Sequence, residues 1–163
     1  MSWRIGAISV PLFTLFKGDA LRTRLDDSGA AVVVTDAGGA EVLDGFDLAV
    51  ITQADLPEAN LASAAGADTG PEDAAVLIYT SGTTGAPKGA VHGHRVLTGH
   101  LPGVEMSHDL LGQPGDVLWT PADWAWIGGL FDVLMPGLAL GVPVVAARMP
   151  RFDVEGCLRI CRE

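Results

Sequence analysis

Three short apolar runs carry the strongest information about the fold of this chain. They span residues 31–35 (AVVVT), 48–52 (LAVIT) and 74–79 (AAVLIY). Each run is too short for a buried helix, and none alternates polar with apolar residues. Such runs are typical of strands that layers of helices bury on both faces.

Helical segments lie between and after these runs. Residues 19–28 predict a helix that Asp19 caps and Gly29 ends. The same alternation continues downstream, with helices expected over residues 94–111, 127–140 and 152–162 and strands over residues 116–120 and 142–147. Pro102 is expected to interrupt the first of these helices, and Pro136 to kink or break the second. Alternating strands and helices predict an α/β fold with a mainly parallel sheet and flanking helices.

The composition fits one folded domain with a surplus of apolar residues. The chain has 163 residues, of which 48% are hydrophobic and 18% charged, and its mean hydropathy is +0.33. The most apolar stretch, residues 127–147, contains Asp132, Pro136 and Pro143, so it predicts a helix, a turn and a strand rather than a membrane span. Residues 57–73 are rich in Ala, Asp, Pro and Gly and are expected to form a surface connection.

The net charge argues against a nucleic-acid partner, and the cysteines favour a reducing compartment. The formal net charge is −10 at pH 7, whereas nucleic-acid surfaces require clustered Lys and Arg, so we expect no nucleic-acid partner. Cys157 and Cys161 are the two cysteines of the chain, and no histidine lies near them in sequence. We therefore expect no metal site there, and a reduced protein of the cytoplasm.

A glycine-rich segment follows the third apolar run directly. Residues 79–89 (YTSGTTGAPKG) contain three glycines, four Ser or Thr hydroxyl groups and one lysine. Glycine lets backbone N–H groups approach an anion, hydroxyl groups add donors, and lysine adds a positive charge. The Walker A pattern does not fit, because Ala86 and Pro87 separate Gly85 from Lys88. The segment therefore predicts a phosphate-binding loop of another kind, rather than a flexible surface turn.

The ten residues TSGTTGAPKG closely resemble the signature of the adenylate-forming enzymes. These include acyl-CoA synthetases, luciferases and the adenylation domains of peptide synthetases. The resemblance implies that the loop holds the β- and γ-phosphates of Mg·ATP and that Lys88 neutralises phosphate charge during catalysis. Carried over by position, the residues expected to bind phosphate are Thr80, Ser81, Gly82, Thr83, Thr84, Gly85, Ala86, Pro87 and Lys88.

A second segment narrows the resemblance. Residues 118–129 (LWTPADWAWIGG) look like the part of acetyl- and medium-chain acyl-CoA synthetases that lies beside the acyl pocket. The resemblance implies that Trp124, Trp126 and Gly128 are candidates for that pocket. The alternative is that both tryptophans anchor the core, as aromatic residues in apolar runs usually do.

For the whole enzyme, the resemblance implies an AMP-forming ligase that joins a carboxylic acid to coenzyme A. ATP and Mg²⁺ would convert the acid to acyl-AMP, and coenzyme A would then take the acyl group. Two alternatives stay open: an amino-acid-activating adenylation domain of a peptide synthetase, or a non-catalytic product of a truncated gene that binds nucleotide weakly. The sequence indicates neither the chain length of the acid nor the oligomeric state.

The likeness runs along nearly the whole chain, but several functional segments of the family have no counterpart in it. Those segments contact adenine, ribose and Mg²⁺, or form the small C-terminal domain with its catalytic lysine. We therefore expect residues 1–163 to be a single partial AMP-binding domain, catalytically incomplete, with the remainder of the synthetase missing. Because buried strands would then lack covering elements, we also expect a large exposed apolar surface and a tendency to aggregate.

Overall fold

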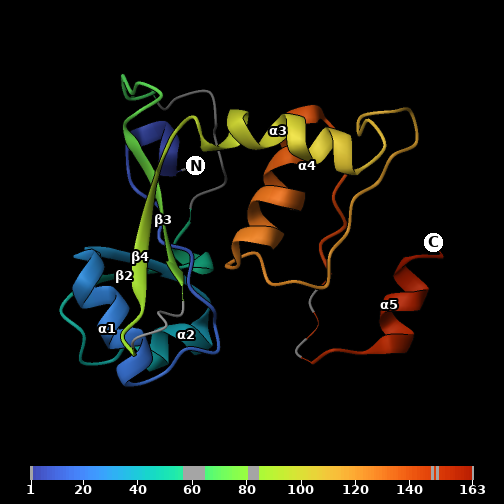
Figure 1. The fold of residues 1–163 in the computed structure, drawn as a ribbon. Helices are drawn as coiled ribbons and strands as arrows, with labels where there is room; N and C mark the ends of the chain where they lie inside the picture. The colour runs from blue at the N-terminus through green and yellow to red at the C-terminus, as the bar shows by residue number, and fades with distance from the viewer. Residues whose placement is uncertain (1, 57–64, 81–84, 148, 150, 163) are drawn as a thin grey trace. The chain divides into compact units, whose positions relative to one another are not determined.

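The computed structural model describes residues 2–56, 65–80, 85–147, 149 and 151–162 (Figure 1). The chain divides into two compact units, Met1–His94 and Arg95–Glu163. Each unit has a hydrophobic cluster of its own. Helices and strands are both present, which confirms the predicted α/β class.

The first half of the N-terminal unit combines helices with a two-stranded parallel sheet. Its regular elements are the 3-10 turn η1 (Ser2–Ile5), helix α1 (Asp19–Ser28), strand β1 (Val32–Thr35), helix α2 (Ala37–Val42), strand β2 (Ala49–Thr52) and the 3-10 turn η2 (Gln53–Asp55). Strands β1 and β2 pair in register from Val32 opposite Ala49 to Thr35 opposite Thr52. The helix and both strands predicted in this region are confirmed, with bounds within one residue of the expected ones.

A small leucine cluster holds α1 to one face of this sheet. Leu21 and Leu25 lie one turn apart on α1 and are buried with Leu43. Because positions i and i+4 share a helix face, these residues form a continuous apolar stripe. Val33 of β1 and Leu48, next to β2, pack against the same cluster. The spacing of leucines in the sequence thus determines which face of α1 is buried.

The ends of α1 agree with the predicted bounds and differ in one detail. Gly29 caps the C-terminus with φ +60°, a conformation that glycine adopts without strain. The predicted N-cap, Asp19, is instead the first helical residue, and Gly18 occupies the cap without a side-chain hydrogen bond. The carboxylate of Asp19 still lies in the first turn, where the helix dipole favours negative charge.

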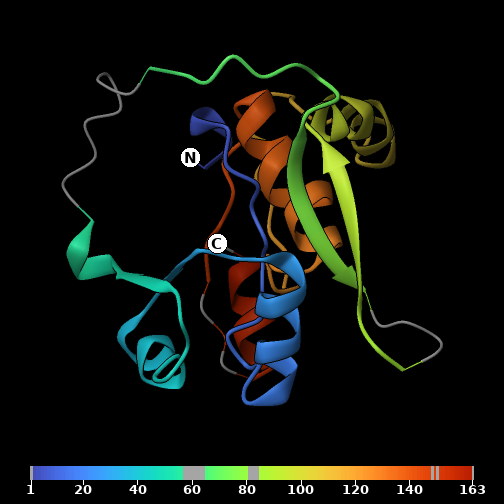
Figure 2. The ribbon, with the colours of Figure 1, turned by 90° about the vertical axis from the view of Figure 1, so that its left-hand side faces the viewer.

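The second half of the N-terminal unit is an antiparallel hairpin. Strand β3 (Ala74–Thr80) pairs with β4 (Lys88–Gly93), and Figure 2 shows the two strands side by side. On its other edge β3 forms a parallel bridge with Ser9, which accepts a hydrogen bond from Leu77 N and donates one to Ala75 O. Strand pairing among the described residues is therefore mixed, with one parallel and one antiparallel pair.

The C-terminal unit is largely helical. Its elements are helix α3 (Val96–Ser107), the π-helix η3 (Gly128–Leu134), helix α4 (Met135–Leu140) and helix α5 (Val154–Ile160). Its core contains Val104 of α3, Val133 of η3 and, from the intervening segments, Leu111, Leu118 and Val142. Phe131 of the π-helix is fully buried.

One of two expectations about prolines in this unit is corrected. Helix α3 runs through Pro102 without interruption. Proline removes the bond to the carbonyl of Thr98, but Thr98 is exposed, so water can satisfy that oxygen. The helix expected over residues 127–140 is divided directly before Pro136, where η3 ends and α4 begins, and Pro136 lies in the first turn of α4, where its missing N–H is tolerated.

The prediction of strands over residues 116–120 and 142–147 is wrong. These segments meet in a single parallel bridge between Leu118 and Val144, with N···O distances of 2.8 Å from Leu118 N to Pro143 O and from Val145 N to Leu118 O. An isolated pair of short strands is marginally stable in water, and Pro143 cannot donate to a ladder. The two segments instead supply apolar side chains to the core.

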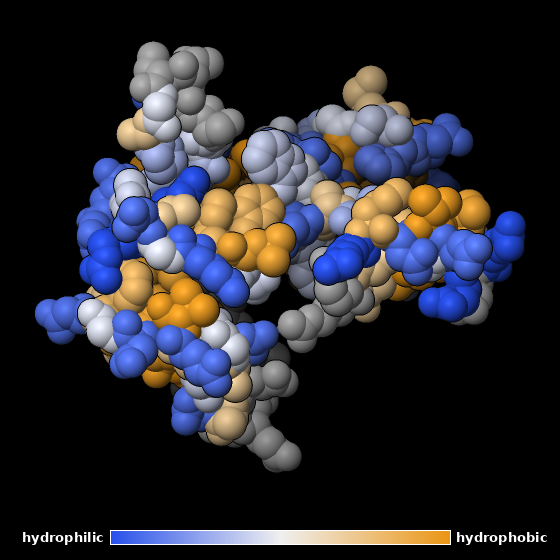
Figure 3. Space-filling view, turned by 90° about the horizontal axis from the view of Figure 1, so that it is seen from below, coloured by the Kyte–Doolittle hydropathy of each residue, from blue (hydrophilic) through white to orange (hydrophobic). Residues whose placement is uncertain are grey.

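Apolar side chains also lie at the surface. More large hydrophobic residues are exposed than buried among the described residues, and the exposed ones include Val32, Val34 and Val91 on strands. Figure 3 shows apolar residues in orange among hydrophilic residues in blue on the face that it draws. The described part of the predicted connection, residues 65–73, has no helix or strand and is mostly exposed, whereas residues 57–64 lie outside the described residues.

Candidate nucleotide-binding site

The phosphate-binding segment predicted from the sequence connects the two strands of the β3–β4 hairpin. Strand β3 is buried along most of its length, with Ala75 and Val76 fully buried and Ile78 3% exposed. Strand β4 is mostly exposed. A buried strand flanked by pairing on both edges therefore provides a rigid support for a loop at its exposed end.

The structure places the two ends of the loop opposite each other. Thr80, the last residue of β3, is the register partner of Lys88, the first residue of β4. Thr80 Oγ1 lies 3.5 Å from the Lys88 carbonyl oxygen. Both residues are exposed. The described residues contain no ion-pair partner for the Lys88 ammonium group, so its charge is available to an anionic ligand.

The remaining predicted loop residues fall into two groups. Ser81, Gly82, Thr83 and Thr84 lie outside the described residues. Gly85 has φ +110°, a backbone conformation that residues with a side chain rarely adopt. The backbone conformation therefore explains why this residue is a glycine. Ala86 is exposed and Pro87 half-buried. The hairpin thus brings Thr80, Gly85 and Lys88 to one end, as expected for residues of one loop.

Packing explains why residue 89 is also a glycine. A methyl group built on Gly89 would lie 2.7 Å from Leu77 Cδ1 and 3.4 Å from Tyr79 Cε1. The side chains of Leu77 and Tyr79 therefore cross the backbone of β4 at the position where the loop rejoins the sheet. The glycine that follows the lysine in the signature keeps this crossing free of steric conflict.

Tyr79 connects this hairpin to helix α1, a contact that no local pattern in the sequence predicts. Its side-chain hydroxyl donates to Asp27 Oδ2 at 2.6 Å, and the Arg24 carbonyl oxygen lies 3.2 Å from the same hydroxyl. The residue is 8% exposed. Burial, followed by the hydrogen bond and charge of Asp27, raises the pKa of Tyr79 to about 12.

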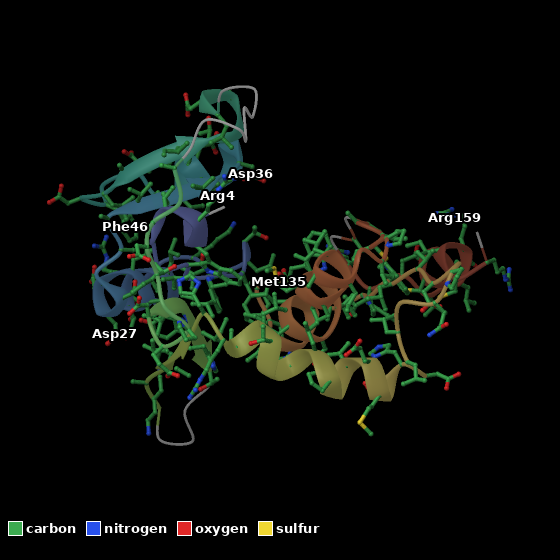
Figure 4. All side chains as sticks on the ribbon, turned by 90° about the horizontal axis from the view of Figure 1, so that it is seen from above. Arg4, Asp27, Asp36, Phe46, Met135 and Arg159 are labelled. Atoms are coloured by element: carbon green, nitrogen blue, oxygen red, sulfur yellow. The ribbon has the colours of Figure 1, made fainter. Side chains whose placement is uncertain are left out.

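Arg24 completes the packing around the tyrosine. Its guanidinium carbon lies 4.1 Å from the centre of the Phe16 ring and 5.8 Å from the centre of the Tyr79 ring. Such stacking on aromatic faces is favourable for a guanidinium group. One Arg24 amino group also donates to Ala20 O within α1. Figure 4 labels Asp27 on this helix.

The predicted acyl-pocket residues lie in the C-terminal unit. Trp124 is half-buried, and Trp126 is 48% exposed. A turn at Asp123 holds them, because its carbonyl oxygen accepts from Trp126 N at 3.0 Å and its carboxylate accepts from Ala125 N at 2.8 Å. Trp126 is therefore no core anchor in this unit. Its role in an acyl pocket stays a prediction.

Gly128, the third pocket candidate, begins the π-helix beside Trp126. The Trp126 ring and the Asp132 carboxylate both approach within 3.4 Å of the position that a side-chain carbon on Gly128 would take. Asp132 Oδ1 lies 3.7 Å from His100 Nε2, which brings a polar pair from α3 and the π-helix next to this segment. π-Helical turns are rare in proteins, and those that occur often lie at functional sites.

The described residues do not contain a cluster of three or more His, Cys, Asp or Glu side chains that could hold a metal ion. The helices described in the structure are too short or too polar to cross a membrane. Cys157 and Cys161 are both free.

Comparison with known proteins decides the family. The family described as AMP-binding enzyme matches residues 2–163, which is nearly the whole chain. The chain belongs to the AMP-binding enzyme family. The resemblance predicted from the TSGTTGAPKG loop is thereby confirmed.

Relatives within the AMP-binding family are ligases of different acids. The chain is 30% identical to acetyl-coenzyme A synthetase of Halorhodospira halophila, over 85% of the chain and 26% of that enzyme. It is 31% identical to the long-chain-fatty-acid–CoA ligase FadD13 of Mycobacterium tuberculosis, over 92% of the chain and 31% of that enzyme. The chain thus spans between a quarter and a third of the length of these relatives.

A solved structure supports the same assignment for the fold. The acyl-CoA synthetase of Brucella canis superposes with a TM-score of 0.77 at 30% identity. The match covers 99% of this chain and 32% of the synthetase. The fold of this chain is therefore part of the fold of an adenylate-forming enzyme.

Proposed function

We propose that this chain supplies the ATP phosphate-binding loop of an AMP-forming carboxylate–CoA ligase. The observation that carries the proposal is the β3–β4 hairpin, which sets Thr80 opposite Lys88 at the two ends of a glycine- and hydroxyl-rich segment. Backbone N–H groups, hydroxyl groups and one ammonium group are the donors that bind a polyphosphate. Membership of the AMP-binding family supports ATP as the ligand.

The reaction proceeds in two steps in this proposal. A carboxylate oxygen of the acid attacks the α-phosphorus of ATP, and the bond to pyrophosphate breaks, giving acyl-AMP. The thiolate of coenzyme A then attacks the acyl carbon, and AMP leaves as the thioester forms. Because the first nucleophile is already ionised, it needs no general base. Mg²⁺, when bound, would neutralise further phosphate charge.

The loop contributes electrostatic stabilisation to the first step. Negative charge builds on the leaving pyrophosphate, and donors fixed in advance toward that charge lower the barrier. We assign this role to the ammonium group of Lys88, the hydroxyl groups of Thr80, Ser81, Thr83 and Thr84, and the backbone N–H groups of residues 82–86. Each hydrogen bond to a charged group contributes about 1.5–3 kcal/mol.

The acid is proposed only as a class. Trp124, Trp126 and Gly128 are proposed to line the acyl pocket. The two curated relatives act, by their names, on acetate and on long-chain fatty acids, so the family leaves the chain length open. The free cysteines support a reducing compartment, and we propose the cytoplasm as the location.

Binding of ATP to the 163-residue chain tests the phosphate-binding role. We expect calorimetric titration to detect ATP binding that Lys88→Gln weakens at least tenfold. Lys17→Gln is the matched control, because Lys17 is exposed and is the other lysine of the sequence. Absence of ATP binding by the folded chain, or equal affinities for the two variants, would contradict the proposal.

Carboxylate-dependent ATP–pyrophosphate exchange tests the reaction. A panel from acetate to octanoate, together with amino acids, separates a fatty-acid ligase from an amino-acid-activating domain. Exchange with a fatty acid means that these residues suffice for adenylation. ATP binding without exchange supports nucleotide binding by a catalytically incomplete chain, and exchange with amino acids alone supports the peptide-synthetase alternative.

A further inference from the structure

Tyr79 lies at the base of the phosphate-binding loop. It is the residue of β3 immediately before Thr80, and its ring lies against the backbone of Gly89, the residue immediately after Lys88. One side chain therefore contacts both strands at the point where the loop begins and ends.

Helix α1 holds the hydroxyl end of this side chain. The Tyr79 hydroxyl bonds Asp27 Oδ2 at 2.6 Å, across 52 positions of sequence, and the Arg24 carbonyl oxygen lies 3.2 Å away. A hydrogen bond with one ionised partner is shorter and stronger than one between neutral groups. The Arg24 guanidinium group stacks on Phe16 and approaches the tyrosine ring, which limits the freedom of α1 at this contact.

The packing of β3 explains why an anchor is needed at this end. Ala75, Val76 and Ile78 are buried, Val76 to Ile78 pair with β4 on one edge, and Ser9 bonds Ala75 and Leu77 on the other. Thr80 keeps its pairing with Lys88 of β4, but it is exposed and lies beyond the bridge to Ser9. Tyr79 is thus the last buried residue before the loop.

We propose that the hydrogen bond between Tyr79 and Asp27 positions the ends of the phosphate-binding loop, so that helix α1 sets the affinity of the chain for ATP. The proposal rests on the phosphate-binding role assigned above. Tyr79 and Asp27 are positioning residues, because they act on the ligand through Thr80 and Lys88. The bond presents those two residues at a fixed separation instead of supplying a donor to the phosphates.

The test compares four variants of the 163-residue chain. Tyr79→Phe removes the hydroxyl, Asp27→Asn removes the charge of the acceptor, and the double variant removes both. Asp26→Asn is the matched control, because Asp26 is an exposed carboxylate one position away on α1 with the same charge change. ATP is the probe, measured by calorimetry at a temperature where circular dichroism shows every variant folded.

We expect each single variant to weaken ATP binding about fivefold or more, the double variant to be no weaker than the worse single one, and Asp26→Asn to match the wild type. Non-additive losses are the signature of two partners in one bond. Equal ATP affinity in Tyr79→Phe, Asp27→Asn and Asp26→Asn would overturn the proposal.

Two further readouts separate the bond, the positioning and the phosphate-binding role. Tyr79 is the single tyrosine of the chain, so absorbance at the phenolate band reports its ionisation alone. Asp27→Asn should lower the pKa of Tyr79, and Asp26→Asn should not.

Amide hydrogen exchange at Thr80 and Lys88 needs no nucleotide. If the wild type does not bind ATP, the phosphate-binding proposal fails. Faster exchange confined to these strand ends in Tyr79→Phe would then support positioning, and unchanged exchange would exclude it.

Discussion

At the scale of single residues, the ionisation of Tyr79 couples the stability of the N-terminal unit to alkaline pH. Its pKa is raised from 10.0 to about 12 because burial and the neighbouring Asp27 carboxylate disfavour the phenolate. Below pH 10 the folded and the unfolded chain both keep the proton, so the stabilisation is fully present. Between pH 10 and 12 unfolding releases the proton, and the free energy of unfolding falls as the pH rises.

This linkage predicts a pH effect that one substitution removes. We expect the wild type to lose about 1–2 kcal/mol of unfolding free energy between pH 10 and pH 12 beyond any loss in Tyr79→Phe. A full two-unit shift would correspond to about 2.7 kcal/mol, which we reduce because Asp27 is exposed and screened by water. Urea unfolding of both chains at pH 8, 10, 11 and 12 measures the difference. Parallel pH profiles would show that Tyr79 titrates normally.

Asp36 is a second residue with a well-defined role. Its carboxylate accepts a hydrogen bond from Gly39 N at 2.8 Å and caps α2 (Figure 4). We expect Asp36→Ala to destabilise the N-terminal unit by about 1 kcal/mol, the usual cost of losing an N-cap, and Asp36→Asn to cost much less. Urea unfolding measures both, and equal losses would mean that the charge, not the cap, stabilises the helix.

At the scale of elements, prediction from the sequence succeeds where side-chain pattern alone decides the structure. Helix α1 has Leu21 and Leu25 on one face and Gly29 at its end, so its bounds follow from local rules. Strands β1 and β2 are likewise predicted by their β-branched runs. The family was predictable because residues 80–89 resemble the signature of the adenylate-forming enzymes.

Elements that depend on a partner were missed. Strand β4 (KGAVHG) is glycine-rich and forms through its ladder to β3, and α2 (AGGAEV) has two glycines and depends on the cap from Asp36. The bond between Tyr79 and Asp27 joins residues 52 positions apart, and no local pattern indicates it. These features follow from tertiary packing, which a single sequence does not display.

The π-helix η3 offers a test at this scale. A methyl group on buried Gly129 would lie 2.6 Å from Asp123 O, a backbone atom that cannot rotate away. We therefore expect Gly129→Ala to destabilise the C-terminal unit by about 1–3 kcal/mol. Gly128→Ala is the control in the same helix, since its nearest neighbours are at 3.4 Å. Thermal unfolding by circular dichroism compares them, and equal melting temperatures would show that the turn at Asp123 relaxes.

At the scale of the whole molecule, the apolar run that forms β1 is covered on fewer faces than its pattern predicts. The run that forms β1 is apolar at consecutive positions, as in strands buried on both faces. Val33 packs into the leucine cluster beneath the sheet. Val32 and Val34, on the opposite face, are 51% and 63% exposed. One face of this small sheet is therefore an open apolar surface within the described residues.

Such a surface favours self-association, which the formal net charge of −10 opposes. We expect sedimentation velocity to show concentration-dependent association of the wild type and less of it in Val34→Lys. The substitution lowers the net negative charge by one and thereby weakens repulsion, so a decrease in association must come from the lost apolar surface. Ala20→Lys, at an exposed position of α1, makes the same charge change without removing a strand valine and should associate at least as strongly as the wild type. A monomeric wild type with a sharp, reversible unfolding transition would show that the open face does not drive association.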